Sequence, residues 1–396
     1  MAAFSFGFWR FATENENYII PIFFSLLGSL FFVKSYIRGI YSYKYIILNG
    51  IFATIACLYH QIHLFWFIGL FFGWIMIDGA YNPKRGIVFA STFIIAPIAY
   101  LLVIAFYLGQ SLSVFNISHF VFHDYYTGAA GNHIGLNNFL LGGINLFRTF
   151  FQVHGQIWVM ISNNKLWLIP GILTLGPILY AVVFIFKGKE LPIPKKSGLA
   201  TLNIIVKTHS LILILQLAFA IYNIGNAEFM VMLPVLAVIL LAKANWIPIK
   251  SLAVTAASLL IWNFSYGIYP NNQLHFNADD QVTQFIIDHP NDKFIAAEPA
   301  IILNQYYYQK GHWPENVWPA PEYYQLHSPV SELKAKVDSN LSNGGNVYTD
   351  CTGRPEIMNR ASLLSTNMDF FKGYNLKDTV AVFETDAGKH SIFRLK

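Results

Sequence analysis

The sequence is poor in charge and in cysteine. Asp, Glu, Lys and Arg make up 12% of the 396 residues, and 55% of the residues are hydrophobic. A typical soluble domain is about 25% charged, so lipid is the expected solvent for most of the chain. The two cysteines, Cys57 and Cys351, cannot define a disulfide framework.

Several nucleotide and protease motifs are absent. The sequence has no Walker loop, dinucleotide fingerprint, Gly-x-Ser-x-Gly elbow or metalloprotease His-Glu motif. These absences argue against an ATP-driven pump and a classical membrane protease. No basic and aromatic segment suggests nucleic acid as a partner.

Long apolar runs are abundant. A helix that crosses the bilayer needs roughly 20 mainly apolar residues, with about 17 as the lower limit. We count about eight runs near this length, at 18–37, 45–59, 64–77, 87–108, 166–186, 204–222, 229–242 and 251–268. The interrupted stretch 138–160 fits an interfacial or re-entrant helix better than a span. The sequence therefore predicts a polytopic α-helical membrane domain of about eight spans.

A shift in charge marks the end of this domain. Of the 47 charged residues (26 basic and 21 acidic), 26 follow Pro270 and only 21 precede it. We therefore expect a transmembrane domain over 1–269 and a small α/β domain over 270–396. The second domain should contain a helix at 279–289 and strands at 293–297, 346–349, 379–384 and 391–395.

The basic residues predict the orientation. If the first run enters from outside, twelve Lys and Arg residues fall at the cytoplasmic face and only Arg10, Arg148 and Lys165 fall outside. The segment before Tyr18 and the α/β domain are then extracytoplasmic. The richness in Phe, Ile, Tyr and Asn suggests an AT-rich bacterial genome, and hence an inner membrane.

Titratable residues gather on this predicted outer face. Arg10, Glu14 and Glu16 adjoin an aromatic cluster and could hold a sugar phosphate or a metal, or form a solvated interfacial belt. His60 and His63, at i and i+3, could bind a metal or phosphate, or serve only as polar anchors.

Three further charged residues belong to the same face. Arg148, in an apolar segment, needs a phosphate or a salt bridge to Asp124 or Glu228. Asp124 follows His123 and could form a polar wall of a pocket. Glu228 opens an apolar run, where a carboxylate is favourable at a helix N-terminus without any catalytic role.

Three short segments carry a resemblance to a known family. Residues 3–18 contain a Trp and a Glu-x-Tyr, residues 58–63 read Leu-Tyr-His-Gln-Ile-His, and residues 226–237 place a Leu-Pro after an aromatic residue. Together with the domain order, they resemble membrane glycosyltransferases of the GT-C superfamily. These polyprenyl-phosphate-sugar enzymes include protein O-mannosyltransferases and lipid A aminoarabinose transferases.

The resemblance implies glycosyl transfer from a polyprenyl-phosphate-linked sugar to an extracytoplasmic glycan, lipid or protein acceptor. It implies that Glu16 is the catalytic residue that corresponds to the family's second acid, that His60 or His63 contacts the lipid phosphate or a metal, and that Arg148 neutralises phosphate. The family sometimes holds that phosphate with a divalent metal ion. The family's principal acidic loop has no counterpart, so we expect a chain that begins about three spans late. A non-catalytic membrane subunit and a transporter of lipid-linked substrates remain the alternatives.

Overall fold

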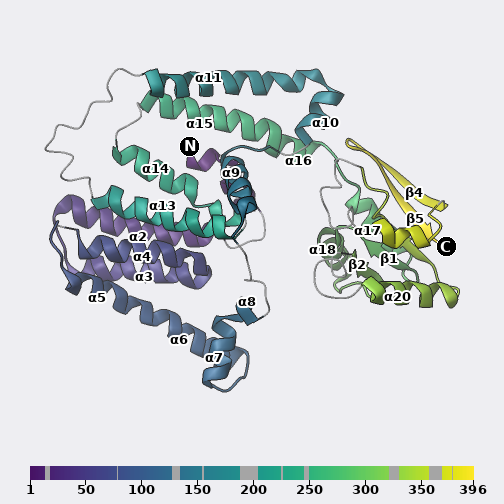
Figure 1. The fold of residues 1–396 in the computed structure, drawn as a ribbon, viewed down its shortest axis with the longest axis horizontal. Helices are drawn as coiled ribbons and strands as arrows, with labels where there is room; N and C mark the ends of the chain where they lie inside the picture. The colour runs from purple at the N-terminus through teal and green to yellow at the C-terminus, as the bar shows by residue number, and fades with distance from the viewer. Residues whose placement is uncertain are drawn as a thin grey trace. The chain divides into compact units, whose positions relative to one another are not determined.

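The computed structural model describes residues 1–13, 18–77, 79–126, 134–153, 156–187, 204–223, 226–244, 249–320, 330–355, 368–376 and 378–396. The chain divides into two compact units, each shown in Figure 1. The helical unit comprises Met1–Val153 and Ile169–Gly267, and the sheet unit comprises His154–Leu168 and Ile268–Lys396. The sheet unit thus includes a short segment from the middle of the chain.

The helical unit is built from apolar helices. Its principal helices are α1 (Phe6–Thr13), α2 (Ile19–Arg38), α3 (Tyr43–Tyr59), α4 (Leu64–Ile75), α5 (Pro83–Ser91), α6 (Ile95–Leu102), α7 (Val114–Val121), α8 (His123–Tyr126), α9 (Leu136–Phe150), α11 (Leu168–Lys187), α13 (Ile204–Tyr222), α14 (Leu233–Ala244) and α15 (Ile249–Asn263). Short helical turns connect several of them, including η1 (Ala2–Phe4), η2 (Gln61–His63), η6 (Ala227–Met230) and η7 (Phe264–Ile268).

Four helical stretches are long and apolar enough to cross a membrane. They are Ile19–Arg38, Pro83–Tyr107, Ile204–Tyr222 and Lys250–Gln273. The other apolar helices that the structure describes, Tyr43–Tyr59, Gln61–Ile75, Lys165–Tyr180 and Ala227–Ala242, have 10–17 residues, at or below the shortest upright crossing. The structure therefore does not support the predicted count of about eight spans, although the four long apolar stretches do support a membrane protein. Breaks such as the extended backbone at His60 divide the apolar sequence into shorter pieces.

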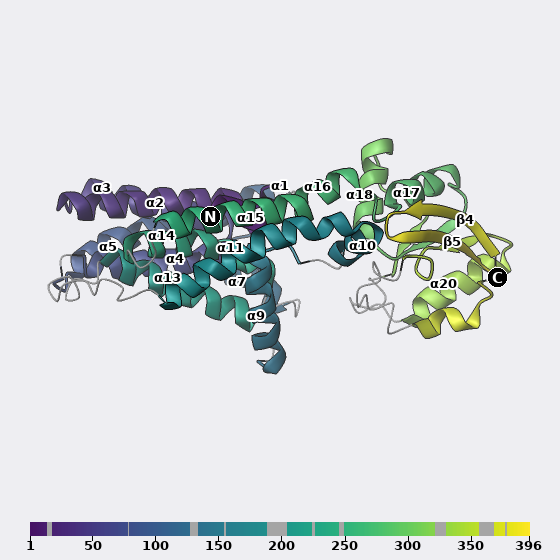
Figure 2. The same ribbon diagram turned by 90° about the horizontal axis from the view of Figure 1, so that it is seen from above.

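Small and polar residues pack the helices closely. Helices α2 and α3 run side by side in antiparallel directions (Figure 2). Gly69 of α4 lies so close to Ile212 of α13 that an added Cβ would overlap that side chain. The hydroxyl of Ser29 accepts a hydrogen bond from Trp66 Nε1 at 2.9 Å and lies 3.0 Å from His209 Nε2. Small residues and interhelical hydrogen bonds of this kind stabilise helix packing where lipid offers no hydrophobic drive.

The amide of Asn263 joins three distant segments. Its Nδ2 donates to the carbonyl oxygens of Phe4 at 2.7 Å and Phe150 at 2.8 Å, and its Oδ1 accepts from Gln152 N at 2.8 Å. Asn263 is fully buried, so each of these bonds satisfies a group that water cannot reach. The last part of α15 is thereby held against η1 and the end of α9.

The sheet unit is an α/β fold around a five-stranded sheet. The strands β1 (Lys293–Ala296), β2 (Val317–Pro319), β3 (Val347–Thr349), β4 (Asp378–Thr385) and β5 (Gly388–Leu395) lie in the order β2-β1-β3-β5-β4. The first three are parallel, and β5 runs antiparallel to both β3 and β4. The unit also contains α10 (Gln156–Asn163), α16 (Tyr269–Gln273), α17 (Asp279–Asp288), α18 (Pro299–Lys310) and α20 (Val330–Ser342).

Alternation along the strands gives the sheet two apolar faces. Phe294 packs in one core with Ile286 of α17 and Ile302 of α18. The next residue, Ile295, packs in the other with Leu333 of α20. Successive strand side chains point to opposite faces, so helices cover both sides. The predicted helix at 279–289 and the four predicted strands are confirmed, whereas β2 was missed.

A group of charged side chains is buried beside β3. Arg354 Nη1 lies 3.2 Å from Asp279 Oδ1 and 3.4 Å from Asp350 Oδ2. The second oxygen of Asp350 accepts from Ala297 N at 2.9 Å, and His390 Nε2 lies 3.3 Å from Oδ2. Burial raises the pKa of Asp279, and the nearby guanidinium opposes that rise.

Candidate functional site: a polar cluster at one end of the helical unit

Tyr18 and Glu228 meet where α2 begins. The Tyr18 hydroxyl donates to Glu228 Oε2 at 2.9 Å, although the residues are 210 positions apart. Asn226 caps η6: its Oδ1 accepts from Glu228 N at 3.1 Å, and its Nδ2 donates to Glu228 Oε2 at 3.2 Å. Both bonds to the carboxylate use Oε2, and the described residues supply none to Oε1. Glu228 is half-buried, so this second oxygen is the one available to a ligand.

His60 lies beside the same carboxylate. Its ring is 4.8 Å from the ring of Tyr18 and 6.3 Å from that of Phe229, centroid to centroid. Burial lowers the pKa of His60, and the negative charge of Glu228 partly opposes this. The imidazole is therefore neutral at pH 7. Because Nδ1 accepts from Ile62 N at 3.3 Å, the proton is assigned to Nε2.

His63 has a different environment from His60. It is 1% exposed, and its Nδ1 lies 2.7 Å from Ser25 Oγ in the helix core. Its Nε2 is buried and has no hydrogen-bond partner among the described residues. Of the two predicted histidines, His60 therefore lies beside Glu228, whereas His63 lies in the interior of the helical unit. No group of three metal-ligating side chains occurs in the described parts of the chain.

We call Tyr18, His60, Asn226, Glu228 and Phe229 the polar end of the helical unit. Helix α1, which carries Arg10, contacts it through the buried Phe11. The Phe11 ring in turn lies 5.1 Å from that of Tyr18.

Helix α9 brings Arg148 to the same region. The amide of Asn138, near the start of α9, donates to the carbonyl oxygens of Ile221 and Tyr222 at the end of α13, at 3.1 and 2.9 Å. These bonds satisfy carbonyl groups that a helix leaves open at its C-terminus. Farther along α9, Arg148 Nη1 donates to Asn145 Oδ1 at 3.1 Å.

Helix α1 packs against α9, because an added Cβ on Gly7 would lie 3.3 Å from Thr149. Among the described contacts, Glu228 pairs with Tyr18 and Asn226 rather than with Arg148. The salt bridge between Arg148 and Glu228 that we considered from the sequence is therefore not formed.

Three predicted residues stay untested. Glu14 and Glu16 lie outside the described residues, as does the side chain of Asp124 on α8. The catalytic assignment of Glu16 remains a prediction. The structure brings His60 and Glu228 together beside Tyr18, and the helices that carry Arg10 and Arg148, α1 and α9, pack against each other and against η6.

Tyr18 and Asn226 were not predicted as site residues. Asn226 had a detectable signal, since an Asn two positions before a carboxylate at a helix start is a typical cap. Tyr18 had no such signal in the sequence, because its hydrogen-bond partner Glu228 is 210 positions away.

Comparison with known proteins adds no relative. No family model, no curated protein and no solved structure matches this chain.

Proposed function

We propose that this membrane protein is a glycosyltransferase that uses a polyprenyl-phosphate-linked sugar. One observation carries the proposal: a half-buried carboxylate, Glu228, meets a neutral imidazole, His60, at one end of an apolar helical unit. Lipid-linked sugars place their reactive group at the membrane surface, where a polar helix end meets water.

The distribution of basic residues along the helical unit supports a position of the polar end at the outer membrane surface. Arg38, at the opposite end of α2, donates to Tyr45, and Arg85 lies 4.6 Å from the ring of Tyr41. An α-helix rises 1.5 Å per residue, so the 20 residues of α2 separate the two ends by about 30 Å. Because basic residues stay in the cytoplasm during insertion, we propose that the polar end and the α/β domain lie outside. From the amino-acid composition we further propose that this membrane is the inner membrane of a bacterium.

The reaction assigns distinct tasks to these groups. The acceptor hydroxyl loses its proton to a carboxylate, and its oxygen bonds to the sugar carbon as the bond from that carbon to the phosphate oxygen breaks. In our proposal Glu16 takes the proton and Glu228 Oε1 holds a sugar hydroxyl. Arg10 and Arg148 stabilise the departing lipid phosphate.

The test is transfer in proteoliposomes of the full chain. Radiolabelled mannosyl, glucosyl and aminoarabinosyl undecaprenyl phosphates serve as donors, and the envelope fraction of the source cells serves as acceptor. We expect Glu228→Gln to lower transfer about tenfold, because the neutral amide accepts the sugar hydroxyl and the bonds from Tyr18 and Asn226 less strongly than the carboxylate does. The matched control is Glu384→Gln, which changes a carboxylate on β4 that is 74% exposed and should leave transfer unchanged. Wild-type turnover by Glu228→Gln would remove this residue from the site.

A transporter of lipid-linked substrates is the second candidate. The structure favours it through His63 and His209, two histidines buried inside the helical unit, because ionisable groups within membrane segments often mark transport pathways. Movement of the same labelled donors across the liposome, without transfer to any acceptor, would establish this function instead.

A further inference from the structure

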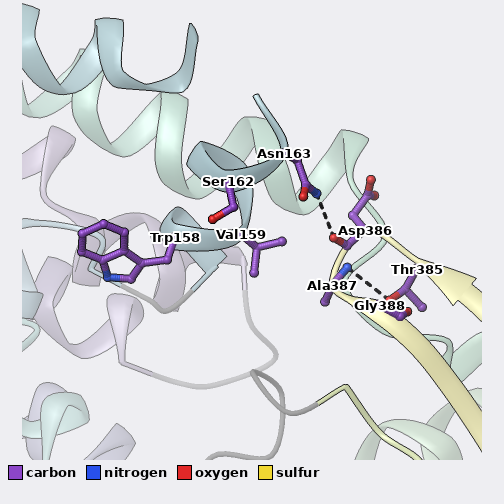
Figure 3. Close-up of a pocket in the computed structure, with 8 residues that line it drawn as sticks. All are labelled: Trp158, Val159, Ser162, Asn163, Thr385, Asp386, Ala387 and Gly388. Atoms are coloured by element: carbon purple, nitrogen blue, oxygen red, sulfur yellow. Dashed lines mark hydrogen bonds between the residues drawn. The ribbon is translucent and has the colours of Figure 1, made fainter. Parts of the chain in front are cut away.

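The sheet unit has a pocket between α10 and the turn that joins β4 to β5. It encloses about 580 Å³ and is lined by Trp158, Val159, Ser162, Asn163, Thr385, Asp386, Ala387 and Gly388. In Figure 3, α10 presents Val159 and Asn163 toward the turn, whereas the Ser162 hydroxyl and the Trp158 ring point to the other side of the pocket. Both walls belong to the same compact unit.

One hydrogen bond joins the two walls, and others fix the turn. Asn163 Nδ2 donates to the carbonyl oxygen of Asp386 at 3.0 Å, as the dashed line in Figure 3 marks. His275 N donates to Asp386 Oδ2 at 2.6 Å, and Asp386 N donates to the His275 carbonyl at 2.7 Å. Thr385 Oγ1 accepts from Ala387 N at 3.2 Å and so closes the turn. The pocket is therefore held in shape before any ligand arrives, which lowers the entropic cost of binding.

The lining combines one aromatic face with uncharged polar groups and one carboxylate, Asp386. Trp158 is 72% exposed, so its ring is open to a ligand. The described residues leave Ser162 Oγ and Asn163 Oδ1 without hydrogen bonds, so these atoms can pair with ligand hydroxyl groups. None of the eight lining residues is Lys, Arg or His, so the pocket does not suit an anion such as a phosphate.

We propose that this pocket binds a neutral saccharide, with a pyranose ring stacked on Trp158 and its hydroxyl groups bonded to Ser162 and Asn163. A sugar ring offers an apolar C–H face to an indole and hydroxyl groups at its edge, which matches this arrangement. The volume lies within the range of about 300–1,000 Å³ typical of small-molecule sites. The site goes beyond the proposed transfer function, because it lies in the other unit and binding needs no lipid-linked donor.

Saturation-transfer NMR on the full chain tests this proposal, in a phosphocholine detergent that carries no sugar. Chitobiose, cellobiose and methyl α-mannoside are the probes. We expect at least one to bind with a dissociation constant on the order of 1 mM, because the pocket is open and its polar contacts are few. Glucuronate, an anionic sugar of similar size, should bind more weakly because Asp386 repels it.

Variants identify the pocket as the site. Trp158→Ala should weaken binding about tenfold or more, as removal of a central aromatic contact does, and Trp158→Phe should retain most of it. Trp313→Ala is the matched control, since Trp313 is 55% exposed in the same unit and does not line the pocket. The proposal is overturned if no probe binds, if Trp158→Ala binds like the wild type, or if Trp313→Ala loses as much. A second measurement uses tryptophan fluorescence in nanodiscs, where the emission of Trp158 is the part that Trp158→Phe removes. The proposal also fails if brominated lipid quenches this emission and sugar does not change it, because the indole then contacts the bilayer.

Discussion

Replacing Arg354 by methionine tests the role of the buried charges in the sheet unit. The guanidinium lies within 3.4 Å of carboxylate oxygens of both Asp279 and Asp350, and these side chains are 4%, 2% and 0% exposed. Methionine fills much of the same volume but leaves two buried carboxylates without the cation. Removing one partner of a buried ion pair costs about 3–5 kcal/mol. We expect the free energy of unfolding of the sheet unit to fall by that amount.

Cys351 provides the assay within the full chain. Its side chain is 4% exposed, and burial raises the pKa of the thiol, so a thiol reagent reaches it only when the unit opens. In a Cys57→Ser background Cys351 is the single cysteine. When opening and closing are fast, the labelling rate follows the open fraction. A loss of about 3–5 kcal/mol then accelerates labelling roughly 100- to 4,000-fold, because 1.4 kcal/mol corresponds to a factor of ten.

Lys396→Met is the control for that measurement. It removes an exposed pair with Asp378, whose atoms are 2.9 Å apart, and such pairs contribute about 0–1 kcal/mol. Labelling should therefore rise less than about tenfold. An Arg354→Met variant that labels no faster than this control at neutral pH refutes the reasoning.

The Arg354→Met defect should also depend on pH. Burial already raises the pKa of Asp279 while Arg354 opposes the rise, so the variant raises it further. The folded state then binds this proton more tightly than the unfolded state does. The stability that protonated Asp279 contributes is complete below its ordinary pKa and is lost as pH rises through the raised value. A pyridyl disulfide reagent, normalised to Lys396→Met at each pH, should show the defect growing from acid to neutral pH. A pH-independent defect would contradict this explanation.

Two further predictions concern the helical unit, and both are measured as thermal stability in detergent. Gly69→Ala should destabilise the unit, because the new Cβ overlaps a side chain of α13. The control Gly143→Ala, which has open space around it, should be neutral or stabilising by up to about 1 kcal/mol. Equal effects of the two substitutions would refute the close packing of α4 against α13. Ser25→Ala should cost about 1–3 kcal/mol because it leaves the buried His63 Nδ1 without a partner, and the exposed Ser91→Ala should cost little. A neutral Ser25→Ala would show that His63 finds another partner.

Local patterns predicted most secondary structure, but not the number of crossings. The apolar run at 204–222 became α13 with the same bounds, and the strand at 391–395 lies within β5. An apolar run can be either a helix buried in the protein or a helix that crosses the membrane, and composition alone does not distinguish them. The run at 229–242 was therefore predicted as a span, although α14 has only 12 residues. Strand β2 has three residues and ends in Pro319, too short a segment for alternation to reveal.

The candidate site was only partly predictable. His60 and Glu228 were chosen for their residue types and for their positions at helix ends, and the structure places both at the polar end. The hydrogen bond between Tyr18 and Glu228 depends on tertiary packing over 210 positions, which no local pattern encodes. The sequence also could not show that His63 turns inward to Ser25, because a 3₁₀ turn rather than an α-helix carries it.

The amide of Asn263 has a consequence for biosynthesis. Its bonds join α15 to the carbonyl groups of Phe4 and Phe150, which precede it by 259 and 113 positions. During translation these two carbonyl groups have no such partner until α15 has been made. We therefore expect this part of the helical unit to close only after the synthesis of α15.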